Sequence, residues 1–208
     1  MTRAIEERDL FMICRAMRKA AMRGAPKGIT IRALRPGEYG AWCDLQCGTS
    51  AAARAAVDGF YQTVYAPEGD LFYERCLVAE DGAGEIMGSC MIWTAYARFP
   101  TLHWLKVRPD CEGRGIGRAL ISRAMAGVAA GDYPVYLHTH PGCLRAIKLY
   151  ADFGFGFITD DVVGRRKNEL SESLPFLRAR LPASVFDQTN FMPAPREFLE
   201  AARAGDAF

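Results

Sequence analysis

The spacing of apolar side chains along the chain predicts a succession of helices and strands. From Leu10 to Ala21, apolar residues recur every three or four positions, which predicts an amphipathic helix over residues 4–23. The following Gly24-Ala25-Pro26 is typical of a helix stop. Elsewhere, short β-branched and aromatic runs alternate with longer segments of helical period, which indicates a mixture of both element types.

The same patterns place the remaining elements. We expect strands at 29–34, 75–80, 85–96, 102–107, 134–139 and 155–159, helices at 38–47, 51–64, 116–129, 142–153, 169–181 and 195–204, and an extended stretch at 185–191. The Asp81-Gly82-Ala83-Gly84 turn joins two of the strands into an antiparallel hairpin. Antiparallel strands followed by a strand–helix–strand–helix–strand unit predict an α/β (α+β) fold around one mixed sheet.

Composition narrows the class of protein. The chain has 208 residues, 50% of them hydrophobic, and a formal net charge of +2. These values exclude a disordered chain and argue against nucleic-acid binding through bulk positive charge. Without a long apolar run we expect no membrane partner and a cytoplasmic protein.

Cysteine and histidine usage predicts no metal. The seven cysteines are odd in number and include no Cys-x2-Cys pair, so reduced thiols are expected. Of the three histidines, His138 and His140 lie two positions apart on a predicted strand and share a face. Two imidazoles alone are a weak signal for a metal site.

The segment 107–120 carries the clearest chemistry. It runs Val-Arg-Pro-Asp-Cys-Glu-Gly-Arg-Gly-Ile-Gly-Arg-Ala-Leu and places three alternating glycines between a strand and a helix. Backbone amides in such a loop approach an anion closely, and the helix N-terminus adds unsatisfied N–H groups. The segment lacks the Lys-Ser/Thr of a P-loop, and Arg118 stands where a dinucleotide-binding loop has its third glycine.

Two motifs together resemble the GNAT superfamily of N-acetyltransferases. The first is Val107-x-Pro109 followed by Gly113-Arg114-Gly115-Ile116-Gly117-x-x-Leu120, and the second is Ala146-Ile147-Lys148-Leu149-Tyr150 followed by Gly154-Phe155. The resemblance covers about residues 29–160. It implies a 1–28 N-terminal helical extension, a 29–163 acetyltransferase domain and a 164–208 C-terminal extension packed on the same domain. Glu112 and Cys143 depart from the family's usual Gln/Arg and Asn.

The resemblance also implies how the cosubstrate acetyl-CoA is held. The fourth and fifth strands of the sheet are expected to splay apart and admit the pantetheine. Its backbone partners would be Leu105 and Val107, with Cys143 at the start of the second motif's helix. The pyrophosphate would lie on the loop residues Gly113, Arg114, Gly115, Ile116, Gly117 and Arg118.

Direct acetyl transfer to an amine needs a base and an acid. The family's position for the acid is Tyr150, whose phenol would protonate the leaving thiolate. The base is less defined: His103 lies on the predicted strand 102–107, where strict alternation places it on one face with Leu105 and Val107. Another residue, or a chain of waters, stays open as the proton acceptor.

The acceptor side is the least defined. Aromatic residues at Phe60, Tyr61, Tyr65, Phe72 and Tyr73 suit an amine pocket and the hydrophobic core equally well. We expect Tyr61, Phe72 and His138 to contact a small-molecule primary amine. The alternatives are a protein lysine or N-terminal acetyltransferase and a non-catalytic acyl-CoA-binding module. A homodimer stays among the candidate assemblies.

Overall fold

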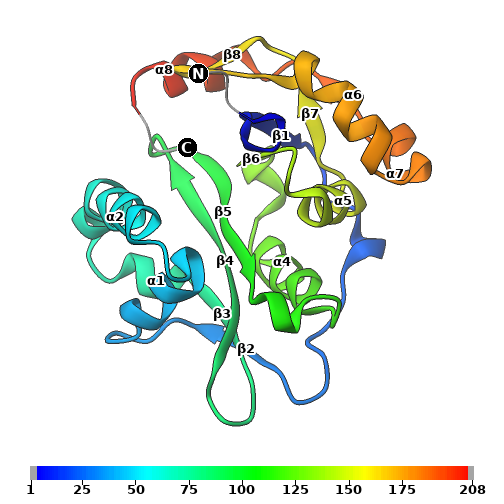
Figure 1. Cartoon of the computed structure of the whole chain (residues 1–208). Coiled ribbons are helices and arrows are strands. Elements are labelled where there is room, and N and C mark those ends of the chain that lie inside the picture. The colour runs from blue at the N-terminus through cyan, green and yellow to red at the C-terminus, as the bar shows by residue number, and fades with distance from the viewer. Residues whose placement is uncertain (1–3, 206–208) are drawn as a thin grey trace. The chain divides into compact units, whose positions relative to one another are not determined.

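The computed structural model describes residues 4–205, which form two compact units (Figure 1). Unit 1 consists of the residues up to 21, residues 94–102 and those from 128 onward. Unit 2 consists of residues 22–93 and 103–127. Strands β4 (Ile86–Ala95) and β5 (Phe99–Val107) contribute residues to both.

Unit 2 is built on an antiparallel arrangement of strands. Its strands β2 (Thr30–Ala33) and β3 (Leu77–Glu80) follow β4 and β5 in the order β5-β4-β3-β2. The β3–β4 pairing sets Ala79 opposite Gly88 and confirms the predicted hairpin.

Helices cover both faces of these strands, as Figure 1 shows for α1 and α2 on one side and α4 on the other. The first face carries α1 (Tyr39–Cys47), α2 (Ala51–Phe60), the π-helical turn η3 (Tyr61–Tyr65), the 3-10 turn η4 (Ala66–Glu68) and α3 (Leu71–Arg75). Their apolar side chains form one buried cluster with Met91 and Trp93 of β4. The opposite face carries α4 (Ile116–Ala126): a Cβ on Gly88 would lie 3.1 Å from Leu120. Residues 88 and 91 therefore point to opposite faces, as strand alternation requires.

Unit 1 contains strands in the order β10-β7-β1-β6, and β6 lies next to the first residues of β5. The strands are β1 (Leu10–Cys14), β6 (Val135–Thr139), β7 (Gly156–Ile158) and β10 (Phe191–Met192). β1 is antiparallel to both of its neighbours, whereas β5 and β6 pair in parallel at Thr101 and Tyr136. The expected opening between β5 and β6 lies beyond this pair and stays a prediction.

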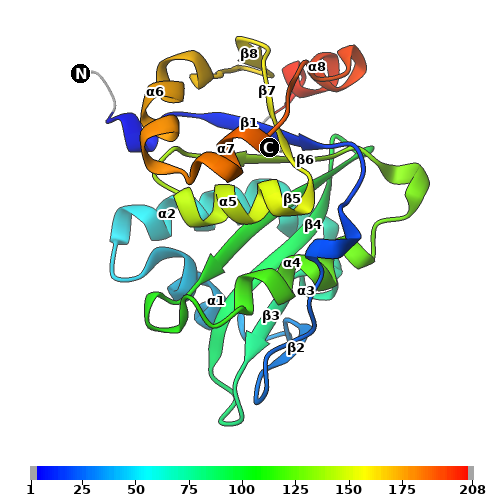
Figure 2. The same cartoon turned by 90° about the vertical axis from the view of Figure 1, so that its right-hand side faces the viewer.

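The helices of unit 1 are α5 (Leu144–Phe153), α6 (Leu170–Arg180), α7 (Ala183–Gln188) and α8 (Arg196–Arg203), and a short hairpin joins β8 (Val162–Val163) to β9 (Arg166–Lys167). Figure 2 shows α5 and α7 side by side along the strands. The ring of Phe198 on α8 stacks on Tyr136 of β6, with centroids 3.7 Å apart and planes 7° apart. This stacking anchors the C-terminal helix on the strands of its own unit.

The helix predicted over residues 4–23 is wrong. Residues Leu10–Cys14 form β1, all five are buried, and 3-10 turns at Ile5–Glu7 and Lys19–Ala21 flank the strand. β6 and β7 pair with the two edges of β1. Consecutive strand residues point to opposite faces, so five buried residues in a row mean that both faces are covered, and such a strand is a continuous apolar run without alternation. The same spacing of apolar residues therefore fits a helix stripe and a central strand.

A second prediction, the extended stretch at 185–191, is also wrong. Residues Ala183–Gln188 form α7, which begins after Pro182, and Phe191–Met192 form β10. The other predicted strands and helices are present with shifts of a few residues at their ends. Within residues 4–205, no helix is long and apolar enough to span a membrane.

Candidate functional site

The glycine loop lies between β5 and α4 in unit 2. After the 3-10 turn Pro109–Cys111, the chain passes through Gly113 at φ 78° and Gly115 at φ 83°. Side chains rarely adopt this left-handed backbone, and an added Cβ on Gly113 would meet no atom within 4 Å. Gly115 is the N-cap of α4 and contributes no capping side chain. No side chain at Gly115 therefore accepts a hydrogen bond from the first backbone N–H groups of α4.

The charges around the loop favour an anion. The first turn of α4 contains no acidic residue, and Arg114 and Arg118 flank Gly115. The nearby Asp110 is held by the guanidinium of Arg108 through bonds of 2.7 and 2.8 Å, which lowers the pKa of the carboxyl. The negative charge of Asp110 is therefore balanced by the adjacent Arg108.

Along the strand before the loop, the backbone N–H and C=O groups of successive residues point to opposite edges of the strand. The N–H of Arg108 donates to the carbonyl of Met87 on β4 at 2.8 Å. Backbone N–H and C=O groups alternate in direction along a strand, so those of Leu105 and Val107 point to the edge of β5 away from β4. This direction is the one that pairing with an extended ligand requires.

Strict alternation fails in the middle of β5. Trp104 has a φ of 53°, and its carbonyl accepts a hydrogen bond of 2.9 Å from Ser89, which itself accepts one from Gln46. Consecutive side chains His103 and Trp104 both contact Phe60 of α2. By contrast, Val107 approaches Gly88 on the α4 face. The prediction that His103 and Val107 share one face is therefore wrong, because the left-handed residue between them reverses the alternation.

His103 is held by two aromatic residues. Its Nδ1 lies 2.5 Å from the hydroxyl of Tyr65, and the indole Nε1 of Trp104 donates to that hydroxyl at 2.7 Å. Burial raises the pKa of Tyr65 well above its usual range, so the phenol keeps its proton. Among the described residues, Nδ1 of His103 is the acceptor placed to take that proton. Neutral His103 is then protonated on Nε2.

The aromatic residues predicted for the acceptor side divide by exposure. Phe72 is 0% exposed and packs against Trp42, Tyr61 and Tyr65, so it serves the core. Tyr61 is half-buried, and burial together with a hydrogen bond to Tyr73 raises the pKa of its phenol to about 12. A contact of Tyr61 with an acceptor stays a prediction.

The second motif lies in unit 1. Tyr150 is buried on α5 with its ring 5.8 Å from that of Phe155. Cys143 is the exposed N-cap of the same helix and makes no side-chain capping bond. The helix-start hydrogen bond that Asn would supply is therefore absent at this position. The roles of both residues stay predictions.

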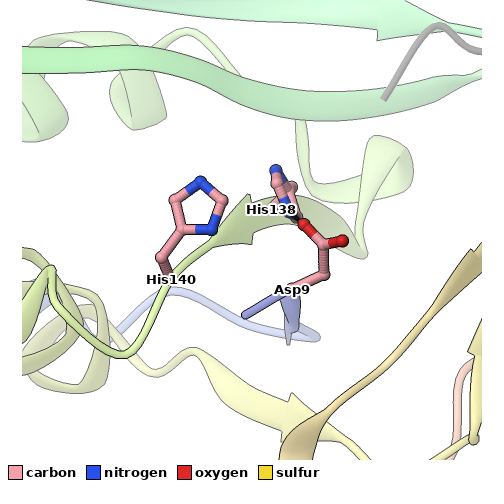
Figure 3. Close-up of side chains that lie close together, drawn as sticks. All are labelled: Asp9, His138 and His140. Carbon is pink, nitrogen blue, oxygen red and sulfur yellow. Dashed lines mark hydrogen bonds and ion pairs between the residues drawn. The ribbon is translucent and has the colours of Figure 1, made fainter. Parts of the chain in front are cut away.

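Three polar side chains gather on the strands of unit 1, as Figure 3 shows for Asp9, His138 and His140. His138 Nε2 lies 2.6 Å from Asp9 Oδ1, and the rings of His138 and His140 lie 4.8 Å apart. Burial lowers the pKa of His138, against the opposing effect of its bond to Asp9. Sequence analysis paired the histidines but missed Asp9, because it placed that residue in a helix instead of directly before β1.

Comparison with known proteins gives the family of the central segment. Residues 72–156 match the family model described as an acetyltransferase (GNAT) domain. The matched span includes the glycine loop, Tyr150 and most of the predicted 29–163 domain. The boundaries predicted at 28 and 163 stay predictions.

A relative and two solved structures extend this match. The chain is 28% identical over 153 residues to a mycothiol acetyltransferase of Streptomyces bingchenggensis. The aligned segment covers 67% of this chain and 47% of the relative. It resembles a GCN5-related N-acetyltransferase from Sphaerobacter thermophilus (TM-score 0.52, 23% identity, 72% of this chain and 48% of that one). It also resembles a GNAT-family acetyltransferase from Colwellia psychrerythraea (TM-score 0.53, 12% identity, 72% and 52%). The fold is therefore that of GNAT proteins, a mixed α/β fold with a mostly antiparallel central sheet flanked by helices. The chain spans about half the length of the relative.

Proposed function

The chain carries an acetyltransferase domain of the GNAT family, and on that premise we propose that it transfers the acetyl group of acetyl-CoA directly to a primary amine of a small molecule. The observation that carries this proposal is the glycine loop at the start of α4, with two left-handed glycines, a cap without a side chain and two flanking arginines. Acetyl-CoA supplies an activated acyl group as a thioester.

The residues of unit 2 fit such a ligand. Backbone amides of Gly113 to Arg118 would hold the pyrophosphate, and Leu105 and Val107 would pair with the pantetheine through groups that point away from β4. The same strand offers N–H donors for the oxygen on which negative charge grows during transfer.

The amine must lose a proton before or during attack, and His103 is the residue we propose for that step. In the arrangement with Tyr65, neutral His103 carries its proton on Nε2. Accepting a proton there requires the other tautomer, in which the buried hydroxyl of Tyr65 loses its acceptor. An unsatisfied buried group costs about 1–3 kcal/mol. Tyr65 therefore sets how strong a base His103 is.

Tyr150 is the residue we propose to protonate the leaving thiolate. A phenol is protonated at physiological pH and can therefore give its proton to the thiolate, after which the phenolate regains a proton from solvent. A small-molecule acceptor is also the simplest extension of the relatives, which are named for mycothiol acetylation. Tyr61, the half-buried aromatic residue of η3, is the proposed contact for that acceptor.

Paired glycine variants test the loop. Gly113 and Gly84 have φ values of 78° and 86°, and an added Cβ meets no atom within 4 Å at either position. Gly113→Ala and Gly84→Ala should therefore lose similar stability, about 1–2 kcal/mol for a left-handed side chain. We expect only Gly113→Ala to weaken acetyl-CoA binding, by at least fivefold in calorimetric titration. Equal affinities in both variants would remove the loop from the binding site.

Turnover needs its own measurement. Release of CoA is followed with polyamines, arylalkylamines, aminoglycosides and lysine peptides as acceptors. The proposal expects release with at least one small amine. Binding of acetyl-CoA without release from any acceptor would instead support a non-catalytic module, and release with peptides alone would support protein acetylation.

A further inference from the structure

We propose that Asp9, His138 and His140 form a binding site for a divalent transition-metal ion of the zinc class. All three residues belong to unit 1. Imidazole and carboxylate ligands together suit Zn²⁺ and its neighbours in the first transition row.

The pairing of two strands brings these residues together. β1 and β6 are antiparallel with Leu10 opposite Thr139 and Phe11 opposite His138. One step further along, this register sets Asp9 beside His140. Because residues two apart on a strand share a face, His138 and His140 project to the same side, where the ring of Phe11 packs 5.0 Å from that of His138. The backbone therefore fixes the cluster.

The protons in the cluster leave lone pairs available. Nδ1 of His140 lies 3.2 Å from the carbonyl oxygen of Arg8. A carbonyl only accepts, so His140 carries its proton on Nδ1 and presents a lone pair at Nε2. Histidines that bind metals commonly donate their other N–H to a backbone carbonyl in this way.

The remaining two ligands share a hydrogen bond that a metal ion can replace. His138 Nε2 and Asp9 Oδ1, 2.6 Å apart, are joined by one hydrogen bond. Binding of a divalent ion at Nε2 requires the other tautomer of the neutral ring, in which the proton lies on Nδ1. The hydrogen bond to Asp9 is then replaced by two bonds to the ion, with no net release of a proton. Asp9 and His138 are 16% and 20% exposed, which leaves the ion a path from solvent.

The distances require a small adjustment. One potential ligand atom from each residue lies within 4.8 Å of the other two. Two ligands about 2.1 Å from the same tetrahedral ion are about 3.4 Å apart, so side-chain rotations must bring the most distant ligand atoms closer by up to about 1.4 Å. Such rotations are ordinary for half-buried side chains.

The surrounding charges nearly balance. Glu169 accepts a hydrogen bond of 3.1 Å from the backbone of Asp9 and lies 3.7 Å from the guanidinium of Arg8. The positive charge of Arg166 acts on His138 and opposes a cation. The carboxylate of Asp9 is thus the group that favours a cation, and Arg166 is the one that limits affinity.

Titration with Co²⁺ tests the site, because its visible spectrum reports coordination geometry. The full chain carries Cys143→Ser in this experiment, since Cys143 is the exposed thiol and the other cysteines are buried. We expect one Co²⁺ bound per chain and its displacement by Zn²⁺, both followed in the visible spectrum.

Matched variants decide which side chains bind the ion. His138→Asn and His140→Gln should each weaken binding more than 100-fold, Asp9→Asn about 10- to 100-fold, and Arg166→Gln should strengthen it severalfold. His103→Asn, the histidine of unit 2, should leave the affinity unchanged. His140→Gln is the least disruptive of these changes, and circular dichroism checks that each variant folds. The absence of saturable Co²⁺ binding, or equal affinity in His140→Gln and its parent, would overturn the proposal.

Discussion

The two histidine regions of this protein hold their imidazoles in opposite ways. In unit 2, the neighbour of His103 is a hydroxyl whose proton points at Nδ1, so the ring presents N–H at its other nitrogen. In unit 1, the neighbours of His138 and His140 are a carboxylate and a carbonyl, each of which accepts a hydrogen bond from a ring N–H. The residue type is the same, but a neighbouring hydrogen-bond donor occupies a lone pair of the ring, whereas a neighbouring acceptor binds its N–H.

The difference separates proton transfer from ion binding. A histidine whose lone pair is engaged by a donor is a weaker base until that donor turns away. A histidine whose N–H donates to an acceptor outside the site, as His140 does to the carbonyl of Arg8, keeps a lone pair on its other nitrogen and suits a cation. The comparison therefore predicts that changes in the two regions affect different measurements.

The largest expected effect is found by comparing a substitution of His103 with a substitution of His140. His103→Asn should lower kcat/KM for the best amine by at least 100-fold, since general base catalysis contributes about 10²–10⁴-fold. His140→Gln should stay within about threefold of the parent in metal-free buffer. Steady-state CoA release measures both. If His140→Gln were the more damaging change, the assignment of the two regions would be reversed.

Tyr150→Phe tests whether unit 1 contributes to turnover through α5. Loss of the phenolic proton should lower kcat by about 100-fold, at the low end of the range for a general acid. The affinity for acetyl-CoA should stay within a few-fold, because the ring and its packing against Phe155 are kept. An unchanged kcat would remove Tyr150 from the reaction.

Tyr65→Phe sharpens the account of His103. The phenol donates to Nδ1 of the neutral ring and so favours the neutral form; without it, the pKa of His103 should rise. The acidic limb of the kcat/KM profile then moves to higher pH. The fold should lose about 1–3 kcal/mol, because the indole N–H of Trp104 is left without its acceptor.

Tyr61→Phe is a suitable control for that experiment. Its phenol is held by Tyr73, not by His103, and its pKa is about 12. The acidic limb should stay where it is in this variant. A shift of equal size in both variants would mean that the limb does not report His103.

Predictions from sequence were correct where the residues of one short segment determine the conformation of that segment. The glycines between Val107 and Leu120 require a loop, and the apolar period after Ile116 requires a helix, so the start of α4 follows from sequence alone. The β3–β4 hairpin follows in the same way from the turn at 81–84.

Such predictions failed where the cause lies far along the chain. β1 is a strand because β6 and β7, more than 120 residues later, pair with its edges. No residue between Leu10 and Cys14 indicates this pairing. The cluster of Asp9 with His138 was missed for the same reason. The left-handed Trp104 depends on Ser89 and Gln46 from other elements, so simple alternation misplaced His103. A positional rule within one strand does not contain such long-range contacts.

The smallest expected effect concerns pH and stability in unit 1. Burial lowers the pKa of His138 in the folded protein below the value of about 6.5 for an exposed histidine. The unfolded chain therefore binds more protons at this group, and its contribution to the free energy of unfolding, complete above about pH 6.5, is lost as the pH falls through the folded pKa. His138→Asn should flatten this part of the pH dependence, measured by urea unfolding between pH 7 and 5. Asp9→Asn should steepen it, since the bond to Asp9 raises the pKa of His138 against the effects of burial, His140 and Arg166. A steeper slope in His138→Asn would contradict the placement of a neutral imidazole between these groups.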